Sequence, residues 1–305
     1  MTRTSATVVT ALAALVVTAA GAVERGRSAP TAAAHGEIAV ATTAGRILLI
    51  DESGHRVRML TRRSSGATFD RQPAWSPDGT RLAFTRTSDD GRSYRVFVMR
   101  ADGSGVRPVS RGRFAGGPAW SPDGRWIAYS SESGLRLVRA DGSRTRTVGG
   151  TGKATADCTE SYATYPSWTP DGTLSFSFHS ETPTDWPEAC RQPHARCGWV
   201  VTSRLDGGAR AAVVHGRDAH WSAAAAAIVY TLPDGGVATV STDAGRPHLL
   251  GRGYLADWSA DSRRIVFARL GQTAAGDSIW LMNADGGNRH LLMRGATDPA
   301  WRPAG

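Results

Sequence analysis

Lysine is almost absent from this chain. Lys153 is the only lysine among 36 basic residues, so arginine carries nearly all of the net charge of +9. The arginines are scattered along the chain, never more than two in a row, without the basic clusters interleaved with aromatic residues that are typical of nucleic-acid-binding proteins. We therefore expect no nucleic-acid partner. The positive charge still favours long-range attraction to anionic polymers of the cell surface.

Long apolar runs are missing after residue 35. One run covers residues 6–23, behind Arg3 and ahead of small residues at 20–22 and 32–34. That order is typical of a secretory signal peptide. Because a membrane-spanning helix needs about 20 consecutive apolar residues, we expect residues 1–36 to be a cleaved signal peptide with a short linker, and an uncleaved N-terminal anchor is the alternative. The expected location is extracellular or in the cell envelope, periplasmic if there is a second membrane, with no transmembrane segment in the remaining chain.

Cysteine is scarce and confined to one region. The chain has Cys158, Cys190 and Cys197, and none directly follows the apolar run, so a lipid-modified N-terminus is not expected. In an exported protein this clustering is typical of one local disulfide and one remaining thiol. The sequence leaves open whether Cys158 pairs with Cys190 or Cys197, or whether Cys190 pairs with Cys197. A zinc site is not expected, because the spacing matches none of the usual paired-cysteine patterns.

The chain does contain a repeat. Six copies of a motif close to Pro-Ala-Trp-Ser-Pro-Asp-Gly occur 37 to 53 residues apart. Their tryptophans are Trp75, Trp120, Trp168, Trp221, Trp258 and Trp301. Each of the first five is followed by an alternating apolar stretch that predicts a strand, and then by a repeated Asp-Gly turn that predicts a β-hairpin. Each period therefore holds about four strands, which is typical of a β-propeller blade.

The two ends of the chain together supply one further blade. Residues 37–61 predict the second, third and fourth strands of a blade without a preceding Trp motif, and residues 297–305 supply a Trp motif without following strands. Joining them gives six blades closed by strand pairing, which removes exposed sheet edges. The predicted fold is an all-β, six-bladed propeller of four-stranded antiparallel blades. It forms one domain over residues 37–305, with residues 1–36 outside it.

The Trp motif itself predicts a structural role. Ser, Pro, Asp and Gly suit the four positions of a type I turn, and the preceding tryptophan can pack between blades. The aspartates of the three complete copies are Asp78, Asp123 and Asp171. Ala224 and Ala304 stand at the aspartate position of later copies, although the tryptophan remains in all six. Because a catalytic aspartate would not be replaced by alanine, we interpret the motif as a packing corner.

The Trp turn and the Asp-Gly hairpin, recurring in phase over residues 37–305, resemble the TolB-type β-propeller repeat. The resemblance implies an exported propeller. The resemblance also implies an N-terminal α/β domain ahead of the propeller in some members, which we do not expect here because residues 1–36 are too few for one. The resemblance therefore applies to the fold and the repeat family.

Catalytic motifs are missing as well. The sequence has no G-x-S-x-G, no H-E-x-x-H and no phosphate-binding loop. We therefore expect a non-catalytic binding or scaffold module at the cell envelope. Its expected partner is an envelope protein or a cell-surface ligand, and the expected state is a monomer.

The most irregular blade is the first place where binding is expected. Loops that differ between blades usually carry function, and the blade of Trp168 has long segments at 149–166 and 179–199 that include all three cysteines. Mixed charge with aromatic residues suits a recognition surface. The candidate contact residues are Asp157, Glu160, Tyr162, Tyr165, His179, Glu181, Asp185, Trp186, Arg191, His194 and Arg196. A disulfide-linked insertion without a ligand is the alternative.

The axial channel is the second place. The residues expected near the axis are Gln72, Tyr165, Asp218, Leu255 and Asp298, with Asp70 and Asp257 close by. Acidic groups such as Asp218 and Asp298 can hold a divalent cation through oxygen ligands, and they can also simply hydrate a wet channel. No other cofactor is expected. The alternative function is a channel-centred, metal-dependent hydrolase or lyase, for which His179, His194 and His220 are the available imidazoles.

Overall fold

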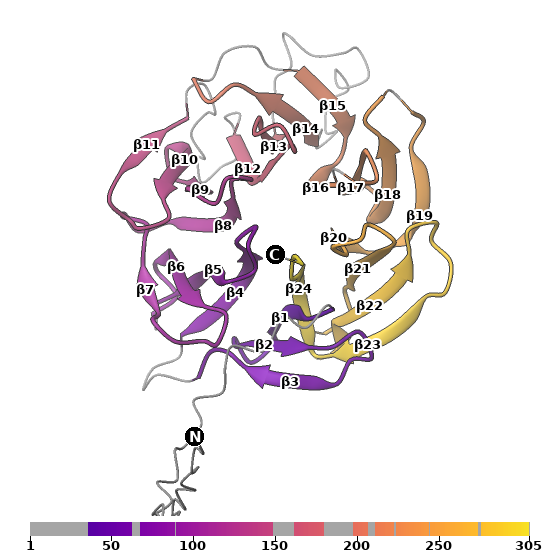
Figure 1. The fold of residues 1–305 in the computed structure, drawn as a ribbon, viewed down its shortest axis with the longest axis horizontal. Coiled ribbons are helices and arrows are strands. Elements are labelled where there is room, and N and C mark those ends of the chain that lie inside the picture. Colours follow the sequence, from indigo (N-terminus) through magenta and orange to yellow (C-terminus); the bar gives the residue numbers. More distant parts are fainter. Residues whose placement is uncertain are drawn as a thin grey trace, which may run out of the picture. The chain divides into compact units, whose positions relative to one another are not determined.

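The alternating apolar stretches form strands, and 24 strands build six sheets arranged in a ring (Figure 1). The structure is a computed structural model. It describes residues 36–62, 68–88, 90–148, 162–179, 198–206, 211–222, 224–243, 245–273 and 276–304. For Tyr162, His179 and Ala212 it describes the backbone alone. The predicted all-β, six-bladed propeller is confirmed.

Each sheet is a four-stranded antiparallel blade, numbered here from the blade that holds both ends of the ring. Blades one to three contain β24 (Ala296–Trp301), β1 (Ile38–Thr42), β2 (Ile47–Ile50) and β3 (Arg56–Met59); β4 (Phe69–Trp75), β5 (Arg81–Thr87), β6 (Tyr94–Arg100) and β7 (Arg107–Pro108); and β8 (Ala115–Trp120), β9 (Trp126–Ser131), β10 (Gly134–Arg139) and β11 (Thr145–Thr147).

The second half of the ring follows the same order, from the inner to the outer strand. Blades four to six contain β12 (Tyr162–Trp168), β13 (Leu174–His179), β14 (Gly198–Ser203) and β15 (Ala211–His215); β16 (Arg217–Ser222), β17 (Ala227–Thr231), β18 (Gly236–Ser241) and β19 (His248–Arg252); and β20 (Tyr254–Trp258), β21 (Arg264–Arg269), β22 (Ser278–Asn283) and β23 (His290–Arg294). Each inner strand ends at the tryptophan of its repeat or one residue beyond it.

The ring is closed in blade one. Inner strand β24 pairs with β1, and Ile38 lies opposite Trp301. The Arg302 amide donates to the Glu37 carbonyl at 2.9 Å, and the Arg302 guanidinium forms an ion pair with the Glu37 carboxylate. The predicted closure by the two ends of the chain is therefore confirmed, and it leaves no inner strand of the ring without a partner among the described blades.

The core is divided among the junctions between blades. Among the described residues, six apolar clusters each join two neighbouring blades. Between blades one and two, for example, Ile47 and Leu49 pack with Leu82, Phe84 and Met99. The second strand of a blade is therefore covered on both faces, whereas outer strand β3 is exposed along its whole length. This packing holds the blades around the axis and leaves the axis itself for a channel.

The Trp turns are held by a repeated set of hydrogen bonds. The Ser76 hydroxyl donates to Asp78 at 2.5 Å and accepts from the Arg81 amide at 2.9 Å. Ser121 and Ser259 make the same pair of bonds in blades three and six. Burial alone would raise the pKa of Asp78, but the hydrogen bonds from Ser76 and Thr80 outweigh it and hold that pKa below its ordinary value. These aspartates therefore stabilise the turn through hydrogen bonds within it.

The Asp-Gly hairpins between third and outer strands contact the neighbouring blade. Gly103 has φ +86°, and a Cβ there would lie 2.7 Å from the Leu60 carbonyl oxygen of blade one. At Gly54 a Cβ would lie 2.1 Å from the Leu292 carbonyl oxygen of blade six. A side chain does not fit at these approaches, which explains why glycine recurs in the hairpin.

Candidate functional site

Every inner strand has a bulge three residues before its tryptophan. The pairing with the second strand shifts register there in all six blades. The residues at this position have φ between +47° and +61°. They are Gln72, Gly117, Tyr165, Asp218, Leu255 and Asp298. A left-handed backbone is uncommon for residues other than glycine, so this bulge is a built feature of the ring, and all six residues line one pocket in the channel.

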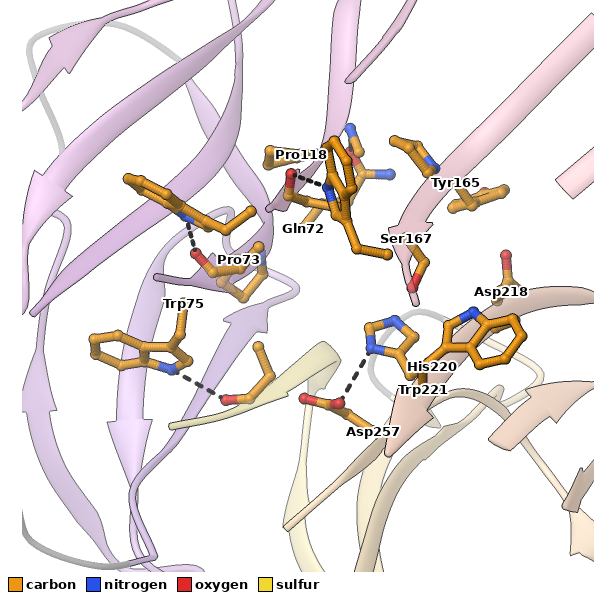
Figure 2. A pocket seen from close by; sticks show the side chains of 18 of the residues that line it. Gln72, Pro73, Trp75, Pro118, Tyr165, Ser167, Asp218, His220, Trp221 and Asp257 are labelled. Carbon is orange, nitrogen blue, oxygen red and sulfur yellow. Dashed lines mark hydrogen bonds and ion pairs between the residues drawn. The ribbon is translucent and has the colours of Figure 1, made fainter. Parts of the chain in front are cut away.

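The pocket occupies the tryptophan end of the channel (Figure 2). Its volume is about 370 Å³, within the range of small-ligand sites. Its apolar wall consists mainly of prolines and tryptophans. The prolines are Pro73, Pro118, Pro166 and Pro299 on the inner strands and Pro122, Pro170 and Pro303 in or after the Trp motifs. A rigid apolar wall of this kind is preformed, which lowers the entropy lost on binding.

The tryptophans connect successive blades through their indole N–H groups. Trp75 donates to the Ala300 carbonyl at 3.2 Å, Trp120 to Ala74 at 3.1 Å, and Trp168 to Ala119 at 3.1 Å. Each acceptor is the residue just before the tryptophan of the preceding blade. Trp258 donates to the His220 carbonyl in the same way, at 3.2 Å. Between blades four and five, by contrast, the Trp221 indole nitrogen is buried without a hydrogen-bond partner among the described residues.

One carboxylate oxygen of Asp218, near this junction, also lacks a hydrogen-bond partner among the described residues. Asp218 is 5% exposed; its Oδ2 lies 3.3 Å from Arg217 Nε, but no described residue hydrogen bonds to its Oδ1. Burial raises the pKa of Asp218 to about 6, against the opposing charges of Arg217 and His220. Asp218 and Trp221 both line the pocket, and each has one buried polar atom without a hydrogen-bond partner among the described residues.

His220 and Asp257 form a hydrogen-bonded pair across blades five and six, with His220 Nδ1 at 3.1 Å from Asp257 Oδ1. Asp257 is fixed by the amides of Trp258 and Trp301, which donate to it at 2.9 and 2.8 Å. The surrounding protein would lower the pKa of His220, but the charge and hydrogen bond of Asp257 raise it above the ordinary value. Figure 2 shows His220 pointing at Asp257 inside the pocket.

The wall of the pocket is acidic. Asp218, Asp257 and Asp298 line it, and none of its described lining residues is arginine or lysine. Burial raises the pKa of Asp298, partly opposed by the hydrogen bond that the Gln72 amide donates to it at 3.2 Å. The pocket is therefore lined by three carboxyl groups in a protein with a net charge of +9.

No group of three or more His, Cys, Asp or Glu residues in the described ranges is arranged to hold a metal ion. Asp218, His220, Asp257 and Asp298 all line the pocket, but no three of them are grouped closely enough to hold a metal ion. The described part of the chain therefore contains no set of ligands for the divalent cation that the sequence suggested at Asp218 and Asp298.

Most residues predicted for blade four lie outside the described ranges. These are Asp157, Glu160, Glu181, Asp185, Trp186, Arg191, His194 and Arg196, together with Cys158, Cys190 and Cys197. Tyr162 and His179 lie opposite each other where β12 begins and β13 ends. Tyr165 belongs to the channel pocket. The blade-four surface and the cysteine pairing stay predictions.

Sequence reasoning placed five of the six bulge residues near the axis but did not identify the His220–Asp257 pair. The signal was present at the position just before each tryptophan. That position holds alanine in three blades and Ser167, His220 and Asp257 in the other three. Aligning the repeats on tryptophan therefore brings three polar residues of successive blades to one level of the channel.

The comparisons with known proteins agree on the fold. No protein-family model and no curated protein matches the sequence. Among solved structures, TolB from Acinetobacter baumannii aligns with a TM-score of 0.67 at 18% identity, covering 88% of this chain and 67% of that one.

Two further structures show the same architecture. A putative TolB from Agrobacterium tumefaciens aligns with a TM-score of 0.61 at 17% identity, covering 88% of this chain and 94% of that one. A chain of a nidogen/laminin complex aligns with a TM-score of 0.62 at 13% identity, covering 87% and 97%. The chain is therefore a β-propeller with the six-bladed, TolB-like fold.

Proposed function

We propose that this chain is an exported, non-catalytic binding module of the cell envelope, and that its channel pocket holds a positively charged, partly apolar segment of a partner. Export rests on the N-terminal residues 1–36, nearly all of which lie outside the described ranges. The TolB-like propeller fold supports a binding or scaffold role. In the described part of the chain no helix is long and apolar enough to span a membrane.

The acidic wall is the observation that carries this proposal. Asp218 is buried with one unpaired oxygen, and Asp298 is held within the same pocket. A buried carboxylate is stabilised by an opposite charge that also hydrogen bonds to it. An ammonium or guanidinium group of a partner, entering the pocket, would supply both. The binding free energy would come partly from pairing an acid that the free protein leaves incompletely paired.

The tryptophan and proline walls suit the rest of such a segment. Two of these tryptophans already stack against arginine side chains of the protein. The Arg81 guanidinium lies 4.7 Å from the centre of the Trp120 ring, and the Arg302 guanidinium lies 4.9 Å from the centre of the Trp75 ring. Contacts of this kind stabilise a cation by about 0.5–2 kcal/mol. A basic side chain with an aliphatic stem therefore matches both the charge and the surface of the pocket.

The blade-four segments remain a proposed second contact surface. Residues 149–161 lead into β12, and residues 180–197 connect β13 to β14. Tyr162 pairs with His179, and His179 pairs with Gly198, at the end of blade four away from its tryptophan. The channel pocket lies at the tryptophan end of the inner strands. A partner bound there would therefore contact the end of the propeller opposite to the proposed blade-four surface.

The enzymatic alternative has no comparable support. The described residues offer no three-ligand metal site, and no described hydroxyl donates to His220, so the His220–Asp257 pair lacks an aligned nucleophile. The likeness to puromycin hydrolase has a TM-score of 0.52 and covers 44% of that chain, which shows only a shared propeller fold. We therefore propose binding and no reaction.

A random peptide library tests the proposal without knowledge of the partner. Selection on the mature protein should enrich arginine or lysine among the bound peptides. Asp298→Asn should then weaken a selected peptide by about tenfold, as expected for loss of a buried charge partner. Glu132→Gln, which removes an exposed carboxylate between β9 and β10, should leave the affinity unchanged. Peptides without basic residues, or equal effects of the two variants, would contradict the proposal.

A further inference from the structure

A second cleft lies between blades five and six, away from the axis. Its volume is about 110 Å³, and its apolar floor includes Phe267, Trp280 and Met282. Three arginines surround this floor, Arg252 from β19, Arg269 from β21 and Arg289 beyond β22. In Figure 1, β18 and β19 adjoin β21 and β22 around the ring. We call this feature the arginine cleft, defined by Arg252, Arg269 and Arg289.

The positive charge of the arginine cleft is not neutralised within the described residues. None of its lining residues is acidic. Across the described ranges, no carboxylate lies within 4.0 Å of Arg252, Arg269 or Arg289, although other arginines do form ion pairs. Arg269 stacks at 5.0 Å from the Trp280 ring centre, and Arg289 Nε donates to the Gly286 carbonyl at 2.7 Å. Both side chains are positioned without being paired to an acid.

In blade two, the arginine equivalent to Arg269 is neutralised by a carboxylate. Arg86 is the eleventh residue after Trp75, as Arg269 is after Trp258. Arg86 stacks at 5.0 Å from the Phe97 ring centre, and it donates two hydrogen bonds to Asp70, at 2.6 and 2.8 Å. The strand pairing makes Phe97 and Trp280 equivalent, because they lie opposite Phe84 and Phe267 respectively.

The carboxylate is missing from blade six. Asp70 stands five residues before Trp75, and Gly253 stands five residues before Trp258. A Cβ at Gly253 would lie 2.5 Å from the Phe267 ring, so no side chain fits at this position. The chain thus keeps the stacked arginine, omits its carboxylate partner and adds two more arginines beside it.

We propose that the arginine cleft binds a phosphate-type dianion. The planar guanidinium fork matches the geometry of phosphate oxygens and can donate two parallel hydrogen bonds. A volume of about 110 Å³ equals the share of only a few water molecules at about 30 Å³ each, which fits one phosphate group. The net charge of +9 would favour the approach of an anion. The arginine cleft and the channel pocket share no lining residue, so the two proposals stand independently.

Calorimetric titration with inorganic phosphate at pH 8 and constant ionic strength tests this site. The expected result is saturable binding to one site. Arg269→Gln should weaken it by about tenfold or more, because a charged hydrogen-bond donor is lost, and Arg252→Gln should weaken it in the same direction. Arg58→Gln, at an exposed position of β3, removes the same charge elsewhere and should leave the affinity unchanged.

A second ligand and a folding control complete the experiment. Dimethyl phosphate, which carries one negative charge and stands for a phosphodiester polymer or a lipid headgroup, should bind at least about tenfold more weakly than inorganic phosphate. Thermal unfolding identifies any variant that is not folded, and the second arginine variant then replaces it. Absence of saturable binding, equal weakening by Arg58→Gln, or equal affinity for the two phosphates would overturn the proposal.

Discussion

At the scale of single residues, burial in the channel pocket raises the pKa values of two acids, Asp218 and Asp298. Burial raises the pKa of Asp218 from 3.8 to about 6, so the folded protein disfavours the charged form. An acid whose pKa is higher in the folded than in the unfolded state lowers stability as pH rises through that interval. Because proteins retain destabilising buried charges mainly where function needs them, this residue supports a binding role.

Replacing Asp218 should therefore stabilise the protein at neutral and higher pH. Two pKa units correspond to roughly 2–3 kcal/mol, so Asp218→Asn should raise the free energy of unfolding at pH 8 by about 2 kcal/mol. The gain should largely vanish near pH 4, where Asp218 is protonated in the folded state and about half protonated in the unfolded state. Urea denaturation at the two pH values measures this. A loss of stability at pH 8 would show that Asp218 is a structural partner instead of a strained acid.

At the scale of structural elements, the two repeated turns have different packing tasks. The Trp turn is held by its own hydrogen bonds, whereas the Asp-Gly hairpin is pressed against the preceding blade. Comparing two glycines distinguishes the cost of a left-handed backbone from the cost of a steric clash with the neighbouring blade. Gly103 has φ +86° and faces the Leu60 carbonyl, whereas Gly91 has φ +66° and a Cβ there would meet no atom within 4 Å.

Alanine at these two positions should have unequal effects. Gly91→Ala should destabilise by about 1–2 kcal/mol through the left-handed backbone alone. Gly103→Ala adds a methyl group 2.7 Å from the Leu60 carbonyl oxygen and should destabilise the protein clearly more, because blades one and two must separate. Thermal unfolding of both variants measures the difference. Equal shifts in Tm would mean that the hairpin does not contribute to blade packing.

The sequence was sufficient to predict the blades but insufficient for the channel pocket. Trp75 and its five equivalents mark the ends of the inner strands, and alternation marks the strands that follow, because both signals are local. The bulge at Gln72 or Leu255 has no sequence signature, since residues other than glycine adopt its left-handed backbone there. The His220–Asp257 pair depends on two blades meeting at one level, which is visible only when the repeats are aligned.

At the scale of the whole molecule, closure in blade one connects the first and the last strands. Deleting residues 297–305 removes nearly all of β24, and with it the Trp301 packing and the ion pair between Arg302 and Glu37. The edge of β1 would then be exposed, which promotes aggregation. We expect loss of cooperative unfolding and an increase in light scattering. Deleting residues 304–305 is the control, and an unchanged Tm after the longer deletion would contradict closure.

The affinity of a selected arginine-containing peptide, followed from pH 5 to pH 8, tests the central claim about the channel pocket most directly. Arginine does not titrate in this range, so any change belongs to the protein. The titratable groups around Asp218 are His220, Asp257 and Asp298, and Arg217 stays charged. We predict that affinity falls as pH is lowered through about 6, where Asp218 is protonated. Because the pKa of His220 lies above its ordinary value, this imidazole also gains charge in the range, so the comparison is made in His220→Gln. This variant should keep a step, and adding Asp218→Asn to it should weaken binding at pH 8 and remove the step. Affinity of His220→Gln that is independent of pH, or a step that persists in the double variant, would contradict the account.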